Sequence, residues 1–409
     1  MFKHSVFINA TALFFMQLLG YISPLLVYPY LTRVLGISGF GQYAMAISIT
    51  ALSFIITDFG FALSGANWLA KNRNKTKEVK HYLSNVCLLK FIFFALCSVV
   101  SSLVIITSQQ LSYLLHSIPA IIFLLFSQTF QMNWLFQGLE KMSLAIYPFV
   151  ISRIIFILTV FIFVKYKADV NIAIFLLGFS NLLSVIISAC LLAREGLSFC
   201  KPSFSDSFNI LKNNISFFLS RASVSIYTSA SAFILGYTTN VHAVAYYSAA
   251  EKLYTAGQSL TGTVSQALYP YLSRTGNKNI FNIALIIVML PLTIGIGIAF
   301  IFSSELINLI YGTAYSESIP ILKIFLICLI INFIGVSYGY PAFAIINRID
   351  VANKTVYMGG LFQISSLLYL YVNDIISANS VAISVLMTET FVMCLRILFY
   401  YIFSKNAHD

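Results

Sequence analysis

Twelve long stretches of apolar residues alternate with short polar connections along the chain. An α-helix needs about 20 residues to cross a hydrocarbon core about 30 Å thick, and each stretch approaches or exceeds that length. The pattern therefore predicts an all-α integral membrane protein with twelve transmembrane helices. They are expected near residues 6–31, 41–66, 82–107, 112–136, 144–165, 170–193, 215–237, 244–270, 280–303, 317–343, 355–373 and 380–403.

The composition agrees with a fold that has lipid as its solvent. Of the 409 residues, 59% are hydrophobic and 9% are charged, whereas soluble domains carry about 25% charged residues. Twelve crossings of about 22 residues each leave short connections and no room for an independent soluble domain. The chain is thus expected to lie almost wholly within the membrane.

Lysine and arginine residues gather in alternate connections. Fifteen lie in segments on one side of the predicted membrane, including a basic loop at 71–80, and three lie on the other side. Because positive connections remain in the cytoplasm, this asymmetry places both termini there. The net charge of +11 is then mostly a signal of topology, and no nucleic-acid motif accompanies it.

The longest polar connection divides the predicted helices into six and six. We expect an N-terminal bundle at 1–200, a cytoplasmic linker at 201–214 and a C-terminal bundle at 215–409. The halves resemble each other weakly: Leu-Gly pairs at 35–36 and 235–236 precede outer turns, and the fourth and tenth helices end in similar positions. Parallel halves favour two bundles around a central cavity, as in alternating-access carriers.

Charged residues within the apolar stretches are the candidate functional residues. A charge at the centre of a membrane helix costs about 2.5–3.5 kcal/mol, so these side chains should face a cavity or one another. The cations outnumber the carboxylates, which favours an anionic cargo, with Arg and Lys binding a phosphate-linked headgroup. The predicted substrate-binding cations are Lys90, Arg153, Arg221, Lys252 and Arg396, and the carboxylates are Asp58, Glu251 and Glu389.

Simpler roles remain open for some of these charges. Arg221 could reach the cytoplasmic interface with its long side chain, and Asp58 could tie two helices together. Lys90, Arg153 and Arg396 lie deeper, where a cavity role is favoured.

Several chemistries lack their sequence signals. The chain has no GxxxxGK[ST] loop for nucleotide phosphates and no GxSxG nucleophile motif. Its five histidines and six cysteines are scattered without metal-ligand spacing. We therefore predict a transporter and not an enzyme, with no cofactor and no metal.

Five segments of the sequence resemble a known family. They read Arg-Val-Leu-Gly to Gly-Phe-Gly-Gln-Tyr at 33–43, Asp-Phe-Gly-Phe at 58–61, Trp-Leu-Phe-Gln-Gly-Leu-Glu-Lys-Met at 134–142, and Tyr-Ser-Ala-Ala-Glu-Lys-Leu at 247–253 with Tyr-Gly-Thr-Ala-Tyr at 311–315. The set is similar to the bacterial O-antigen flippases (Wzx-type), polysaccharide transporters of the multidrug, oligosaccharidyl-lipid and polysaccharide (MOP) exporter superfamily. Many relatives carry an arginine where Asn67 and Trp68 stand here, which puts any inherited arginine role there in doubt.

The resemblance implies a MATE-like fold and a specific transport reaction. It implies that an undecaprenyl-diphosphate-linked oligosaccharide of lipopolysaccharide or a related glycan crosses from the cytoplasmic to the periplasmic leaflet of the bacterial inner membrane. The partners would be that lipid-linked substrate, membrane lipids and other envelope polysaccharide assembly proteins. Because buried carboxylates can bind protons, Asp58, Glu251 and Glu389 are candidates for coupling to a proton or Na⁺ gradient. The alternatives are a cation-coupled multidrug exporter of the same superfamily and a membrane-embedded polysaccharide polymerase.

Overall fold

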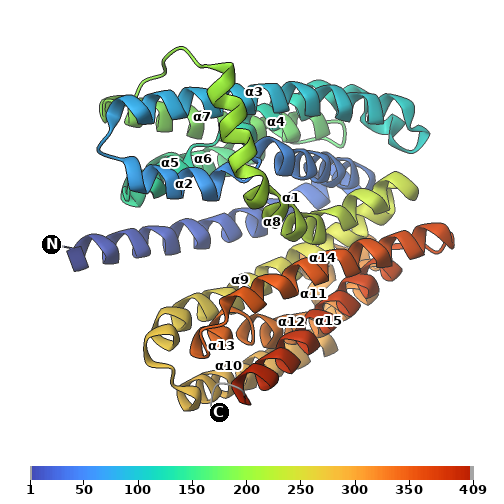
Figure 1. Cartoon of the computed structure of the whole chain (residues 1–409). Helices are drawn as coiled ribbons and strands as arrows, with labels where there is room; N and C mark the ends of the chain where they lie inside the picture. The colour runs from blue at the N-terminus through green and yellow to red at the C-terminus, as the bar shows by residue number, and fades with distance from the viewer. Residues whose placement is uncertain (1, 406–409) are drawn as a thin grey trace. The chain divides into compact units, whose positions relative to one another are not determined.

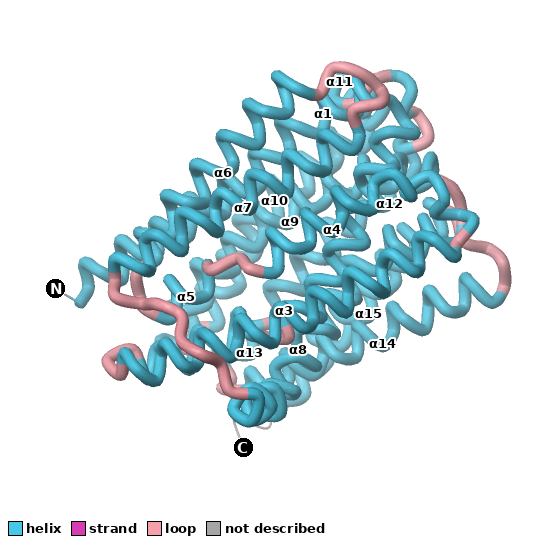
Figure 2. Tube along the Cα trace, turned by 90° about the horizontal axis from the view of Figure 1, so that it is seen from above, coloured by secondary structure: helices cyan, strands magenta, loops and turns pink. Residues whose placement is uncertain are grey.

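The computed structural model describes residues 2–405, except for the side chains of residues 2–15, 17–18, 21, 216, 220–221, 223–229, 266–267, 270 and 405. This part of the chain consists of helices joined by short loops and contains no strand (Figures 1 and 2). A membrane gives backbone groups no water to bond, and a helix bonds them internally. The α-helices are α1 Phe2–Asp58, α2 Phe61–Asn72, α3 Thr76–Thr107, α4 Ile118–Thr129, α5 Asn133–Gly138, α6 Met142–Phe163, α7 Val170–Arg194, α8 Phe204–Thr238, α9 Val241–Thr275, α10 Lys278–Ile301, α11 Ser303–Ile310, α12 Ser318–Ser337, α13 Tyr340–Ile345, α14 Ile349–Val372 and α15 Ala378–Lys405. Two short 3₁₀ segments, η1 Gln109–Ser117 and η2 Thr313–Tyr315, connect neighbouring helices.

Each of the twelve predicted apolar stretches falls mainly on helix, which confirms the all-α fold class. Among the described residues, nine helical segments are long and apolar enough to cross a membrane. The exact number of twelve crossings and the cytoplasmic position of both termini stay predictions.

The first two predicted helices form a hairpin within α1. Gly36, with a φ of 69°, interrupts the helical backbone at the turn predicted from the Leu-Gly pair. Because the two arms fold back on each other, the rings of Tyr28 and Tyr43 lie 6.2 Å apart between centroids. Glycine suits this position because a side chain would disfavour the left-handed φ.

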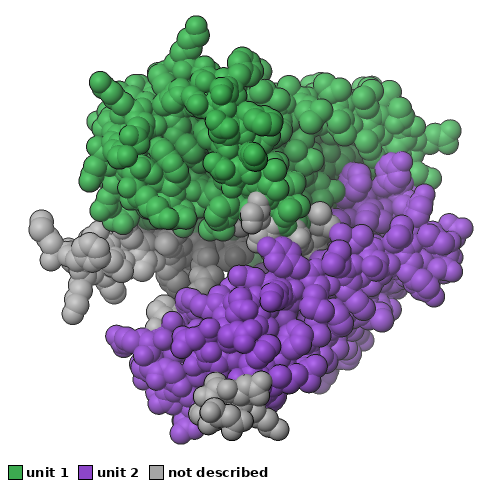
Figure 3. Space-filling model, viewed as in Figure 1, with its two compact units in different colours: residues 1–225 green, residues 226–409 purple. Residues whose placement is uncertain are grey.

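The chain divides into two compact units, residues 1–225 and 226–409, coloured separately in Figure 3. The boundary falls inside α8, later than the predicted linker at 201–214. Residues 204–214 of that segment form the first turns of α8. They are helical because Ile210 and Leu211 pack against the apolar core of the first unit, a contact that their polar neighbours conceal in the sequence.

A broken helix occurs at corresponding places in the two units. α4 and α5 are separated by three residues, and α12 and α13 by two. Each pair ends in a non-glycine residue with positive φ, Glu140 at 58° and Asn347 at 54°. In both cases the next backbone N–H donates to a carbonyl five residues earlier at 2.9 Å, the bond of a Schellman cap. The weak repeat between the halves is therefore present in the backbone, and interrupted helices at matching positions are typical of transporters.

Candidate functional site

Two of the predicted site residues form a buried ion pair in the first unit. Lys90 Nζ on α3 lies 3.9 Å from Asp58 Oδ1 at the end of α1, and both side chains are 4% exposed. The same ammonium donates a hydrogen bond of 2.9 Å to the carbonyl of Thr129 on α4. The pair thus joins three helices, which matches the interhelical tie considered for Asp58.

The backbone break after α1 brings Asp58 into this position. Phe59 and Gly60 both have positive φ, 44° and 77°, so the chain turns sharply before α2. The ring of Phe59 stacks on Phe218 of α8 with centroids 4.4 Å apart. A Cβ on Gly60 would lie 2.9 Å from the backbone carbon of Phe217, so the close approach of α8 requires glycine here.

Arg153 lies on α6 with a different environment. Its guanidinium carbon is 5.1 Å from the centroid of the Phe149 ring, a cation–π distance. Arg153 Nε and the hydroxyl of Tyr43 are buried and have no hydrogen-bond partner in the described structure. The two groups also interact electrostatically. Arg153 is therefore a predicted cation with unused donor capacity, a property that a bound anion could satisfy.

The second unit holds Glu389 and Arg396 on α15, where a spacing of seven places them on one face. Arg396 is 8% exposed. It donates from Nε to Thr355 Oγ1 at 3.0 Å and from Nη1 to the carbonyl of Gly335 at 2.8 Å. A Cβ on Gly339 would lie 3.1 Å from Arg396 Nη1, so this glycine, in the break after α12, leaves room for the guanidinium.

Glu389 contacts a polar group on α9. Tyr254 donates from its hydroxyl to Glu389 Oε1 at 3.4 Å and accepts from Gln258 Nε2 at 2.7 Å. Glu251 and Lys252, also on α9, lie 3.7 Å apart between Oε2 and Nζ. The structure therefore brings Asp58 to Lys90 and Glu251 to Lys252. Glu389 and Arg396 interact electrostatically along one face of α15, and Arg153 has a different environment in the first unit.

The side chain of Arg221 lies outside the described residues, so its predicted roles stay untested. The assignment of the other charges to cargo binding or ion coupling also stays a prediction.

Sequence reasoning missed a pocket in the first unit. It has a volume of about 500 Å³ and lies among α2, α3 and the start of α8. Five asparagines and the ring pair Trp68 and Tyr82, stacked with centroids 4.1 Å apart, contribute to its lining. The signal in the sequence was the recurrence of asparagine near the predicted cytoplasmic ends of three helices, at 67, 85, 209, 213 and 214.

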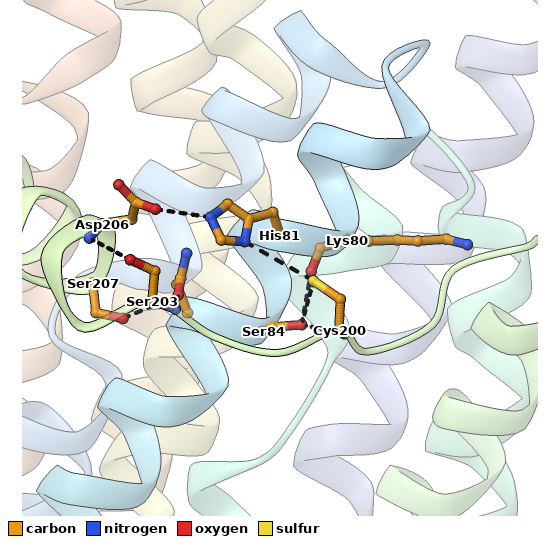
Figure 4. Close-up of polar contacts among 8 residues, drawn as sticks. Lys80, His81, Ser84, Cys200, Ser203, Asp206 and Ser207 are labelled. Carbon is orange, nitrogen blue, oxygen red and sulfur yellow. Dashed lines mark hydrogen bonds and ion pairs between the residues drawn. The ribbon is translucent and has the colours of Figure 1, made fainter.

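A network of polar contacts fixes the start of α8 beside α3 (Figure 4). Asp206 Oδ2 lies 2.8 Å from His81 Nε2, and this hydrogen bond lowers the pKa of the Asp206 carboxyl. Asn85 Oδ1 accepts from the backbone N–H of Ser203 at 2.7 Å and from Ser207 Oγ at 3.2 Å. The rim of the pocket is thus held by side chains from both helices.

Cys200 joins the same network just before α8. Its backbone N–H donates to Ser84 Oγ at 2.8 Å, and its Sγ lies 4.0 Å from His81 Nδ1. Hydrogen bonds from Ser84 and His81 lower the pKa of the Cys200 thiol below its ordinary value.

Comparisons with known proteins agree with this architecture. A protein of Escherichia coli (strain K12) described as "Putative O-antigen transporter" is 28% identical over 93% of this chain and 93% of its own length. A protein of Shigella dysenteriae with the same description is 29% identical over 65% of this chain and 67% of its own.

Solved structures show the fold. "Lipid II flippase MurJ, inward closed conformation" matches with a TM-score of 0.71 and 17% identity, covering 98% of this chain and 90% of that one. An inward-facing multidrug resistance MATE family transporter of the MOP superfamily matches with a TM-score of 0.65 and 14% identity, covering 96% and 95%. The predicted MATE-like fold is therefore confirmed.

The family model described as "Polysaccharide biosynthesis protein" matches residues 6–276. This is more than half of the chain and includes residues 6–225 of the first unit, with its buried ion pair and its pocket. The chain therefore belongs to the polysaccharide biosynthesis protein family.

Proposed function

We propose that this protein is a flippase for lipid-linked oligosaccharides in the bacterial inner membrane. It carries an undecaprenyl-diphosphate-linked repeat unit of O antigen or a related glycan from the cytoplasmic to the periplasmic leaflet. The observation that carries the proposal is the match, over 93% of both chains, to the Escherichia coli protein described as "Putative O-antigen transporter". The fold shared with a lipid II flippase over 98% of this chain supports it.

The physical task of such a protein fits the residues present. A polyprenyl tail can remain in lipid while its polar headgroup needs a path sheltered from hydrocarbon. Arg153, with a buried Nε that lacks a partner, is the predicted cation best placed to bind a diphosphate. Two units that open alternately to each side would give the headgroup its path.

Deleting the gene and then measuring the lipid-linked oligosaccharide tests this function. We expect the intermediate to accumulate in the cytoplasmic leaflet of the deletion strain, and its export to return when the chain is expressed from a plasmid. The Arg153→Gln protein, made at the same level, should restore little export. A deletion strain that accumulates no such intermediate would refute the flippase.

A cation-coupled multidrug exporter is the second candidate, because MATE transporters share the fold. Drug efflux from the same strains separates the two functions. If the protein is a drug exporter, its deletion should lower the resistance of the strain to cationic drugs. The Arg153→Gln protein should then still export these drugs. The flippase predicts that deletion leaves resistance to cationic drugs unchanged, and that Arg153→Gln impairs export of the lipid-linked intermediate.

A further inference from the structure

We propose that the pocket among α2, α3 and α8 binds a sugar residue of the oligosaccharide headgroup on the cytoplasmic side. The inference rests on the proposed function and assigns one part of the cargo to one part of the first unit. The volume of about 500 Å³ lies within the range of ligand pockets, about 300–1,000 Å³. All lining residues belong to the first unit, so the pocket is complete without the second.

The floor of the pocket is polar and held in place. Asn85 and Asn214 are buried, at 1% and 5% exposure. The carbonyl end of Asn85 is used by Ser203 and Ser207, so its amide N–H groups are the end available for a ligand. Asn214 donates from Nδ2 to the carbonyl of Ile210 at 2.8 Å, which leaves its oxygen as an acceptor. The floor therefore offers both a donor and an acceptor.

The rim repeats this chemistry in exposed positions. Asn67, Asn209 and Asn213 line the pocket and are exposed. Asn209 and Asn213 are four residues apart on α8, so they share one face of that helix. A carboxamide donates and accepts, as a sugar hydroxyl or acetamido group does. Trp68 and Tyr82 both line the pocket and stack on each other. They add an aromatic surface against which the apolar face of a sugar ring can pack.

The charges of the lining argue against the diphosphate as the occupant. Lys71 is offset by the carboxylates of Glu78 and Asp206 on the same surface. His81 is already bonded to Asp206 at 2.8 Å. A diphosphate would meet two carboxylates without a surplus of cations, whereas a neutral sugar would not be repelled. The sugar part of the headgroup therefore fits this pocket better than its phosphates.

The position of the pocket agrees with loading from the cytoplasm. The connection between α2 and α3 lies beside it and carries Arg73 and Lys75, within the basic loop predicted to be cytoplasmic. A flippase must bind its cargo on that side before transport. The pocket would thus select the glycan at the first step.

Tryptophan fluorescence of the full-length protein in lipid nanodiscs can test the site. The chain has 2 tryptophans, so Trp134→Phe leaves Trp68 as the reporter. The probes are the undecaprenyl-diphosphate-linked repeat unit extracted from the deletion strain and undecaprenyl diphosphate without sugar. We expect a saturable change with the first probe and none with the second at the same concentrations.

Variants of the rim then assign the response to the pocket. Asn209→Leu with Asn213→Leu removes two exposed amides and should raise the apparent Kd about tenfold, because the hydrogen bonds that these amides make to the sugar are lost. Asn74→Leu is the matched control, because Asn74 is exposed in the α2–α3 connection and does not line the pocket. Transport of the same probe into proteoliposomes, with both tryptophans present, provides the comparison if Trp134→Phe disturbs folding.

The outcomes separate the pocket from the flippase. Unchanged affinity and transport in the double variant would overturn the pocket and leave the flippase standing. An equal response to undecaprenyl diphosphate would also overturn it, because the phosphates would then be the recognised group. If the unsubstituted protein neither bound nor moved the repeat unit, the proposed function would fail and the pocket with it.

Discussion

Replacing Lys90 by methionine tests whether the buried ion pair holds the first unit together. At 3.9 Å between Nζ and Oδ1, the Coulomb attraction is about 4 kcal/mol at an effective dielectric constant of about 20. Removing one partner of a buried pair costs about 3–5 kcal/mol, because the other charge is left without compensation. Lys90→Met also removes the hydrogen bond to the Thr129 carbonyl. We therefore expect a loss of about 4 kcal/mol.

The unfolding temperature of the purified protein in detergent measures this loss. A change of this size corresponds to a decrease of roughly 10 °C for a unit of about 200 residues. Lys77→Met is the matched control, because Lys77 is exposed on the first turn of the same helix, and it should leave the unfolding temperature unchanged.

The double variant Asp58→Asn with Lys90→Met separates a structural role from a functional one. Without either charge, no carboxylate is left buried and unpaired, so most of the lost stability should return. If the pair is only a tie, transport should return as well. A stable double variant without transport would refute the structural interpretation and assign one of these charges to the transport cycle. Unchanged stability in Lys90→Met alone would show that the ion pair with Asp58 does not stabilise the first unit by about 4 kcal/mol.

Three further predictions follow from single residues. Gly60→Ala should lower the free energy of unfolding by about 2 kcal/mol or more. A left-handed φ costs about 1–2 kcal/mol for a residue with a side chain, and the added Cβ would lie 2.9 Å from the Phe217 backbone. An unchanged unfolding temperature would contradict this prediction. Arg153→Gln should reduce transport at least about tenfold while the unfolding temperature falls by no more than about 4 °C, because its Nε has no hydrogen-bond partner to lose and the cation–π contact with Phe149 contributes only about 0.5–1 kcal/mol. A larger loss of stability would point to a structural role. Alkylation of Cys200 near pH 7 should become slower in the Ser84→Ala protein. The hydrogen bond from Ser84 lowers the pKa of the Cys200 thiol, so its loss reduces the fraction of thiolate. Equal alkylation rates would show that this hydrogen bond has no influence on the thiol.

The sequence predicts the helices of this fold well because lipid imposes a simple rule. Apolar length suffices to locate the helices, because each of the twelve apolar stretches falls mainly on helix. Even the turn at Gly36 and the end of the broken helix before Glu140 follow from local residues. These features depend on residues that are close together in the sequence, so local sequence patterns can predict them.

Contacts between distant residues could not be predicted in the same way. Asp58 and Lys90 are identifiable as intramembrane charges, but their pairing depends on how α1, α3 and α4 pack. The pocket asparagines are common polar residues in the sequence. They line one pocket only because Asn85 of α3 holds the start of α8 beside it. The position of Arg396 beside Gly339 likewise depends on how α15 packs against the break after α12.

The three intramembrane carboxylates differ in their fitness for ion coupling. A coupling carboxylate must be protonated at one stage of the cycle and ionised at another. A neighbouring hydroxyl can form a hydrogen bond to the carboxylate in either protonation state. An adjacent ammonium group, in contrast, favours only the ionised carboxylate. Asp58 and Glu251 lie within 4 Å of lysine Nζ atoms. Glu389 also interacts with a cation, Arg396, but that guanidinium donates its hydrogen bonds to Thr355 and to the Gly335 carbonyl, and Glu389 contacts the hydroxyl of Tyr254 at 3.4 Å. We therefore expect Glu389→Gln to remove the dependence of transport on an imposed proton or Na⁺ gradient in proteoliposomes, with facilitated flipping retained. Tyr254→Phe should weaken the same dependence. A Glu389→Gln protein that still responds fully to the gradient would exclude Glu389 as the coupling residue.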